Sequence, residues 1–294
     1  ATFAPTIAEM TPSQTPTFKD PSDYKIVGTH KPRRDIPAKV DGSLKFALDV
    51  RLPDMLYASV IRSPVSGGGI IHVDEAAARA IEGVVDVIVI PESSVDSMLG
   101  GSVSGEAVAV VADSYWTANR ALQELTVQWT ETGFESVSSD DIFAQFDRDI
   151  SSKTDRQTDH AEGEVDSVFS TAAKVIDADY HVPYLAHTCM EPLNATADVR
   201  DGRAEVWVGC QNPLGFRRDI ASVLGLDEED VTLLNHAMGG GFGRKARPDY
   251  AIQAAQIAQV VGRPVQLIWS REEDVRQDFY RPAVQSRFRA AFDV

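Results

Sequence analysis

The sequence contains few cysteines and no long apolar run. Only two of its 294 residues are cysteines, Cys189 and Cys210, too few for a disulfide framework and wrongly spaced for a zinc site. We expect both to be small buried residues. No stretch approaches the roughly 18 consecutive apolar residues that a membrane helix needs, and the first ten residues lack the basic-then-apolar layout of a signal peptide. The sequence therefore predicts no transmembrane segment, and its cysteines do not indicate a redox compartment.

Positive charge is also scarce. The chain has 44 Asp and Glu against 28 Lys and Arg, a formal net charge of -16, and its basic residues are scattered along the sequence. Such a surface repels a phosphate backbone, so we expect no nucleic-acid partner. Hydrophobic residues make up 43% of the chain, which is enough for two domains with proper cores. The expected class is a globular protein or a piece of one, and the missing initiator Met is compatible with processing or a boundary at residue 1.

The distribution of proline, glycine and apolar runs predicts an α+β (mixed α/β) protein with two structured regions. Residues 1–22 are rich in Pro, Ser and Thr without apolar periodicity, which predicts an extended arm or linker. A first domain is expected over residues 23–133, an acidic connection over 134–172, and a second domain over 173–294. Within the first domain, the pattern predicts a helix at 73–83 and strands at 24–28, 44–52, 55–64 and 84–91.

Residues 106–130 have the order of a βαβ unit. The predicted strand 106–112 is followed by a helix at 115–125, which Asp113 or Ser114 can cap, and then by a strand at 126–130. A crossover of this length implies that the two strands are parallel.

The second domain is expected to alternate strands with two helices. Both helices begin near a proline and end at a glycine, as helix termini often do. Asp201-Gly202 predicts a tight hairpin within the longest strand run. The predicted strands are 173–184, 196–209 and 231–238, and the predicted helices are 213–225 and 248–262.

The segment "NHAMGGGFGRK", residues 235–245, places four glycines in five positions between a predicted strand and a predicted helix. Two nucleotide-binding patterns fail here: Ala246 stands where a P-loop needs a hydroxyl residue, and Arg244 stands where Gly-x-Gly-x-x-Gly needs its third glycine. A plain glycine turn is the alternative, but each glycine destabilises a loop by roughly 0.5–1 kcal/mol. The pattern favours a loop whose backbone contacts a large flat or phosphorylated ligand.

Polar residues at two other strand ends bear on the same loop. "LAHTCMEPLNATADV" carries His187, Cys189, Glu191 and Asn194, and "VWVGCQNP" ends in Gln211 directly before a helix. Strand ends collect ligand contacts in α/β proteins. Alternatives remain for each residue: Gln211 suits a helix cap, Glu191 a hydrogen bond within the loop, and His187 a packed or surface position. The His, Cys and Glu spacing matches no zinc pattern, so no metal ligand is assigned.

Three motifs in order, "PYLAHTCMEPLNATADV", "VWVGCQNP" and "MGGGFGRK", resemble the molybdenum-binding subunit of the xanthine oxidase family of molybdenum hydroxylases. The segments at 33–64 and 108–129 resemble that family's α/β-hammerhead domain. Residues 262–283 resemble most of all the isoquinoline 1-oxidoreductase β-subunit and the membrane-associated aldehyde dehydrogenase large subunits. The resemblance implies a hammerhead domain over 23–133 and the first part of a molybdopterin-binding domain over 173–294.

The resemblance also implies roles for individual residues. Gln211 would be the catalytic residue of this chain, donating a hydrogen bond to the apical oxo ligand of molybdenum. The implied cofactor-binding residues are Gly239, Gly240, Gly241, Phe242, Gly243 and Arg244. Many relatives have a second glycine and an acid after Gly-Phe-Gly, whereas this chain has Arg244 and Lys245, as in the isoquinoline branch.

The implied cofactor is molybdopterin with Mo, in the cytosine dinucleotide form usual in bacteria, and the implied reaction hydroxylates an aldehyde or an N-heteroaromatic substrate with oxygen from water. The implied partners are a polypeptide that completes the molybdopterin site, an iron–sulfur subunit and, in some members, a cytochrome c subunit. The family's catalytic glutamate lies in a Gly-x-Gly-Glu motif that this sequence lacks, so we expect the chain alone to be inactive. A binding or scaffold chain with the same fold is the alternative. Relatives of this branch often act in the periplasm, which we favour over the cytoplasm.

Overall fold

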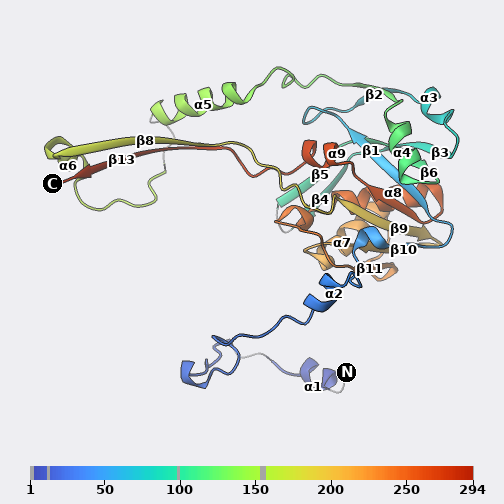
Figure 1. The fold of residues 1–294 in the computed structure, drawn as a ribbon, viewed down its shortest axis with the longest axis horizontal. Coiled ribbons are helices and arrows are strands. Elements are labelled where there is room, and N and C mark those ends of the chain that lie inside the picture. The colour runs from blue at the N-terminus through green and yellow to red at the C-terminus, as the bar shows by residue number, and fades with distance from the viewer. Residues whose placement is uncertain (1–2, 12–13, 98–99, 153–156, 294) are drawn as a thin grey trace. The chain divides into compact units, whose positions relative to one another are not determined.

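A computed structural model describes residues 3–11, 14–97, 100–152 and 157–293 of the chain (Figure 1). The chain divides into two units, Ala1–Leu44 and Lys45–Val294. The first unit contains the short helices α1 (Ala4–Ala8) and α2 (Ile36–Val40) and no buried residue among those described. The strand predicted at 24–28 is wrong: these residues form bends and turns, because Ile26 and Val27 are exposed and have no apolar partner surface.

The second unit contains the remaining helices and strands. Its helices are α3 (Ala76–Arg79), α4 (Tyr115–Leu122), α5 (Ser139–Ser152), α6 (Val165–Thr171), α7 (Pro213–Leu224), α8 (Asp249–Val261) and α9 (Arg271–Arg276). Its strands are β1 (Leu56–Arg62), β2 (Ile70–Asp74), β3 (Val84–Ile90), β4 (Ser93–Ser97), β5 (Gly100–Ser104), β6 (Ala107–Ala112), β7 (Thr126–Trp129), β8 (Lys174–Val182), β9 (Asn194–Arg200), β10 (Arg203–Val208), β11 (Val231–Asn235), β12 (Val265–Ile268) and β13 (Val284–Phe292).

Seven of these strands form one mixed sheet in the order β11-β10-β9-β12-β1-β6-β3. The pairs β10–β11 and β1–β12 are parallel, and the other neighbours are antiparallel. The sheet joins strands from both predicted domains, because β12 lies between β9 and β1. The mixed α+β class is confirmed, and the predicted domain boundaries stay a prediction.

Both faces of this sheet are covered where β6 lies. The alternate residues Ala107, Ala109 and Val111 belong to the large core cluster under α7 and α8, whereas Val108 and Val110 belong to a smaller cluster with residues of α3 and α4. A strand buried on both faces has no polar alternation, which explains its uninterrupted run of small apolar residues. The alanines of α8 let that helix approach the sheet closely, because they carry only a methyl group.

The parallel βαβ unit predicted over 106–130 is wrong. The strands and the helix exist as β6, α4 and β7, but β7 pairs antiparallel with β2 in a separate two-stranded sheet. Strand β6 instead pairs antiparallel with β1 and β3. Element order alone suggested a crossover, but long-range pairing decided the direction.

Two further local predictions need correction. The strand predicted at 44–52 is a short 3-10 turn, Ala47–Asp49, closed by the Asp49 carboxylate, which accepts the Phe46 N–H. The helix predicted at 73–83 is reduced to α3, because β2 extends to Asp74. Apolar residues suggested both elements. Tertiary contacts replaced the strand predicted at 44–52 and shortened the helix predicted at 73–83.

The predictions around the second domain's hairpin and helices are confirmed. Strands β9 and β10 are joined at Asp201-Gly202, whose φ angles of 53° and 73° suit a tight turn. Helices α7 and α8 end at Gly225 and Gly262 in the left-handed conformation. These signals are local, so they are readable from sequence.

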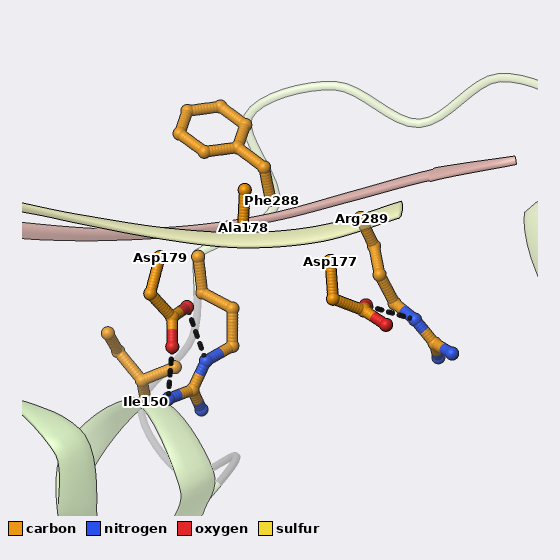
Figure 2. A pocket seen from close by; sticks show the side chains of 7 residues that line it. Ile150, Asp177, Ala178, Asp179, Phe288 and Arg289 are labelled. Atoms are coloured by element: carbon orange, nitrogen blue, oxygen red, sulfur yellow. Dashed lines mark hydrogen bonds and ion pairs between the residues drawn. The ribbon is translucent and has the colours of Figure 1, made fainter. Parts of the chain in front are cut away.

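Strands β8 and β13 form a separate two-stranded ribbon (Figure 1). One face carries exposed ion pairs: Arg289 Nε lies 2.8 Å from Asp177, and Arg287 Nε lies 2.9 Å from Asp179 (Figure 2). Arg287 also contacts Asp147 of α5 at 2.9 Å. Because these pairs are exposed, each contributes little to stability, and the Arg287–Asp147 pair links α5 to the ribbon.

The connection predicted over 134–172 contains two helices, α5 and α6, that the polar composition did not reveal. None of the helices within the described ranges combines the length and the apolar character needed to cross a bilayer.

We expect Tyr250→Phe to lower the free energy of unfolding by about 1–2 kcal/mol. The fully buried Tyr250 hydroxyl donates to the Gly209 carbonyl at 2.9 Å, and its loss leaves that carbonyl without its partner. Urea unfolding measures the change. The matched variant Tyr180→Phe, at an exposed position on β8, should change stability by less than about 0.5 kcal/mol. Equal stability of the two variants would contradict the assignment.

Candidate functional site

The parallel neighbours β10 and β11 bring Gln211 to the glycine stretch. Both strands end at the same edge of the sheet, β10 running into Cys210 and Gln211 and β11 into the loop 236–243. The Gln211 N–H donates to the Lys245 carbonyl at 2.9 Å. Two segments separated in sequence therefore form one surface, which we call the glycine-loop site and define as Gln211 together with residues 239–243.

The side chain of Gln211 is oriented by the loop itself. Its Oε1 accepts the Gly243 N–H at 3.1 Å, which leaves Nε2 as the exposed end of the amide. Nε2 donates to no acceptor within the described residues. The helix-cap alternative for Gln211 is wrong, because the neighbouring Asn212 caps α7 by accepting the Gly215 N–H at 3.2 Å. Gln211 therefore offers a hydrogen-bond donor to whatever lies over the loop.

Each glycine of the loop has a physical reason to lack a side chain. A Cβ on Gly239 would lie 2.4 Å from the Glu191 Cβ, and one on Gly241 would lie 2.8 Å from Gln211 Oε1. Gly240 and Gly243 have φ angles of 100° and 109°, which side chains disfavour. The loop can therefore approach Gln211 and Glu191 only because these positions are glycine.

Three successive backbone N–H groups in this loop point at no protein acceptor. Within the described residues, the amides of Gly240, Gly241 and Phe242 donate to no carbonyl or side chain. The amides on either side, Gly239 and Gly243, are used internally. Unpaired amides in a run suit polar or anionic ligand atoms, as backbone nests do. Phe242 is 75% exposed above them, although its φ angle of 52° is uncommon for a non-glycine residue.

Glu191 anchors the start of the loop from behind. It makes a reciprocal pair with Gly239, its N–H donating to the Gly239 carbonyl at 3.0 Å and its Oε2 accepting the Gly239 N–H at 2.9 Å. The same Oε2 accepts from Lys245 Nζ at 2.8 Å, and both side chains are buried. Burial alone would raise the pKa of Glu191, but the hydrogen bonds from Lys245 and Gly239 outweigh it and hold the pKa below its ordinary value. Glu191 therefore fits the alternative of a hydrogen bond within the loop and not a catalytic role.

Arg244 anchors the end of the loop. Its guanidinium makes a bidentate pair with Asp249 at 2.9 and 2.8 Å. Its Nε lies 3.1 Å from Asp278, without the geometry of a hydrogen bond, and the side chain is 1% exposed. Because the guanidinium is turned into the protein, any contact of Arg244 with a ligand has to come from its main chain. The sequence did not mark Asp249 or Asp278 as partners of Arg244, because acids are common at helix starts and in loops.

The remaining candidates from residues 185–199 are His187 and Cys189, which lie next to the loop, and Asn194, which lies in the core. His187 Nδ1 lies 3.0 Å from Asp278, and Cys189 Sγ contacts the Gly241 carbonyl at 3.5 Å. Burial raises the pKa of the Cys189 thiol, and it raises the pKa of the Cys210 thiol to about 11. Both cysteines are buried, as the sequence predicted. Asn194 is buried at the start of β9. In the part of the chain that the structure describes, no cluster of three or more His, Cys, Asp or Glu could hold a metal ion.

Comparison with known proteins identifies the family. Residues 149–294, which include the whole glycine-loop site, match the molybdopterin cofactor-binding domain. The isoquinoline 1-oxidoreductase subunit beta of Brevundimonas diminuta is 32% identical over 93% of this chain and 34% of its own length. Residues 149–294 belong to the molybdopterin cofactor-binding domain family, and the chain is similar over most of its length to part of the molybdenum-binding subunits of the xanthine oxidase family. The resemblance drawn from the three motifs is thereby confirmed.

Other members agree on family and fold. The membrane-bound aldehyde dehydrogenase [pyrroloquinoline-quinone] of Gluconacetobacter polyoxogenes is 32% identical over 94% of this chain and 35% of that protein. The quinoline 2-oxidoreductase structure from Pseudomonas putida 86 superposes with a TM-score of 0.67 at 23% identity, over 90% of this chain and 37% of that chain. The chain thus spans about a third of the length of the relatives described. None of these comparisons assigns a role to a residue of the glycine-loop site.

Another buried acid lies close to the Arg244 network. Glu273 of α9 accepts the Arg62 N–H at 2.9 Å, and Arg62 in turn lies 4.0 Å from Asp249. Glu273 is 3% exposed, and burial raises its pKa from the ordinary 4.5 to about 7. Arg276 is 3.8 Å away and does not offset the burial.

Lys245→Met should destabilise the chain by roughly 3–5 kcal/mol, because it leaves the Glu191 carboxylate buried without its cation. Urea unfolding of Lys245→Met, Glu191→Met and the double variant completes a double-mutant cycle. This cycle isolates the interaction energy between the two side chains. We expect the double variant to be clearly more stable than the sum of the single losses predicts. Strict additivity would show that the two side chains do not act as a pair.

Glu273 should make stability depend on pH. A folded-state pKa raised above the unfolded value contributes stability that is present below about pH 4.5 and lost as the pH rises through about 7. Relative to Glu273→Gln, the parent should lose roughly 2–3 kcal/mol of unfolding free energy between about pH 4.5 and pH 8. Urea unfolding at the two pH values tests this. A constant difference between parent and variant would refute the shifted pKa.

Proposed function

We propose that this chain is part of a molybdenum hydroxylase and that its glycine-loop site forms one wall of the molybdopterin site. The observation that carries the proposal is the set of open donors, Gln211 Nε2 and the amides of Gly240, Gly241 and Phe242, at a loop in which four of five residues are glycine. The position of these groups inside the matched cofactor-binding domain supports it.

The residues present fit such a group on chemical grounds. Molybdopterin is flat and rich in hydrogen-bond acceptors, and this site offers fixed donors, a close backbone and few competing acceptors. Gln211, Gly239, Gly240, Gly241, Phe242 and Gly243 would hold it, with Arg244 fixing the loop from behind. When bound, the cofactor supplies the two-electron redox chemistry of the reaction.

The contribution of this chain is binding and orientation. Gln211 would donate through Nε2 to an acceptor atom above it, because Oε1 is already occupied by Gly243. Preorganised donors of this kind stabilise developing negative charge without reorganising during the reaction. The exposed ring of Phe242 would keep water from the loop amides.

The proposed reaction is hydroxylation of an aldehyde or an N-heteroaromatic compound with oxygen from water, supported by the names of the two curated relatives. We also propose the cytosine dinucleotide form of the cofactor, a partner polypeptide completing the site, an iron–sulfur subunit, a cytochrome c subunit where electrons pass to one, and a periplasmic location. These finer points rest on the family resemblance. The curated isoquinoline relative is itself named as a subunit.

Gln211→Glu tests the proposal in the complete molybdenum-containing complex. Glu keeps an oxygen to accept the Gly243 N–H but replaces the outward amide donor with an acceptor. We expect turnover of aldehydes and N-heteroaromatics to fall by about 10²-fold or more, by analogy with loss of an oxyanion donor.

The matched control is Gln128→Glu on the exposed face of β7, which should leave turnover unchanged. Metal and pterin analysis accompanies both variants. A complex that contains no molybdenum, or a Gln211→Glu variant with parental turnover at parental metal content, would refute the proposed role.

A further inference from the structure

A pocket of about 530 Å³ opens beside the glycine loop. It is lined by Leu185, Ala186, His187, Phe242, Phe279 and Arg281. The volume lies in the range of small-molecule sites, which are mostly apolar with a few fixed polar groups. Gln211 does not line this pocket, so it is a different surface from the row of open donors.

Aromatic and aliphatic side chains form the walls. Phe242 extends from the loop and contacts no other aromatic ring within the described residues. Phe279 is held rigidly, because the guanidinium groups of Arg244 and Arg247 lie over its ring at 4.9 and 5.1 Å from the centroid. Leu185 is half exposed and adds an aliphatic wall. These walls suit a flat apolar ring.

His187 supplies a fixed polar group. Its main-chain N–H and its Nδ1 both contact the carboxylate of Asp278, at 2.5 and 3.0 Å. A carboxylate only accepts hydrogen bonds, so Nδ1 carries a hydrogen and Nε2 is the ring nitrogen that does not face Asp278. A Cβ built on Gly243 would lie 3.6 Å from Nε2, which puts this nitrogen at the loop side of the pocket.

Arg281 supplies a charge. Its backbone pairs with that of Leu185, another residue of the pocket wall, which fixes where the side chain begins. Its guanidinium makes no hydrogen bond or ion pair with any residue that the structure describes, whereas Arg244 forms ion pairs with Asp249 and Asp278. An unpaired guanidinium at the edge of an apolar pocket is complementary to a carboxylate.

We propose that this pocket binds an aromatic carboxylate, with the ring against Phe242 and Phe279 and the carboxylate on Arg281. For substrates, this proposal rests on the proposed function, because Phe242 belongs to both the pocket and the glycine-loop site. It then makes Arg281 a specificity-determining residue that favours acidic aromatic substrates over neutral ones.

Calorimetric titration of the full chain with 2-naphthoate and 2-naphthamide tests binding without requiring molybdenum. The two probes share ring and shape but differ in charge. We expect naphthoate to bind at least about tenfold more tightly than naphthamide, and Arg281→Met to remove that preference. Arg203→Met, at an exposed arginine on β10, is the matched control and should keep it.

A parent chain that binds both probes equally, or that fails to bind naphthoate, overturns the proposal, as does an Arg281→Met variant with parental affinity for naphthoate. Phe242→Leu should weaken both probes, because it removes the ring but not the charge.

The complete complex provides a second readout. Arg281→Met should raise KM for 4-carboxybenzaldehyde at least about tenfold while leaving kcat and the KM for benzaldehyde unchanged. An equal change for both aldehydes overturns the specificity role. Failure of the proposed function would instead appear as a complex without molybdenum. The calorimetric result on the chain does not depend on molybdenum, so the two failures can be distinguished.

Discussion

The glycine loop is held in place by two buried cations that directly follow it. Arg244 is paired with Asp249 and Asp278, and Lys245 is paired with Glu191, whose carboxylate also accepts the Gly239 N–H. Such pairs offset a large cost of burying charge only when every group has its partner. The arrangement therefore fixes both ends of a five-residue loop that has little intrinsic preference for one conformation.

That constraint explains how the loop can expose unpaired donors. A glycine-rich segment alone would lose conformational entropy on ordering and would gain little in return. Here the rigid ends, the parallel strands β10 and β11 and the Gln211 amide fix the loop in advance, so that binding a ligand costs little further ordering. The same carboxylate of Asp278 orients His187 toward the neighbouring pocket, which links the two surfaces through one buried acid.

The sequence predicted the parts of the fold whose signals are local. Proline at the start and glycine at the end marked α7 and α8, and Asp201-Gly202 marked the β9–β10 turn. The direction of a strand, and the sheet that it joins, depend on contacts between residues far apart in the chain. For this reason the sequence predicted β7 beside β6, whereas β7 pairs with β2. Within the site, the ordered motifs identified Gln211 and the glycines as candidates. The partners of Arg244 and the unpaired state of Arg281 could not be predicted, because they depend on which residues folding brings together.

The function proposed for this chain depends on contact of Gln211 and the loop amides with the molybdopterin cofactor. An experimental structure of the complete, molybdenum-loaded complex tests it most directly. We expect Gln211 Nε2 and the amides of Gly240, Gly241 and Phe242 within about 3.2 Å of cofactor acceptor atoms, with Arg244 still turned toward Asp249. A cofactor bound elsewhere, with these donors facing only protein or solvent, would contradict it.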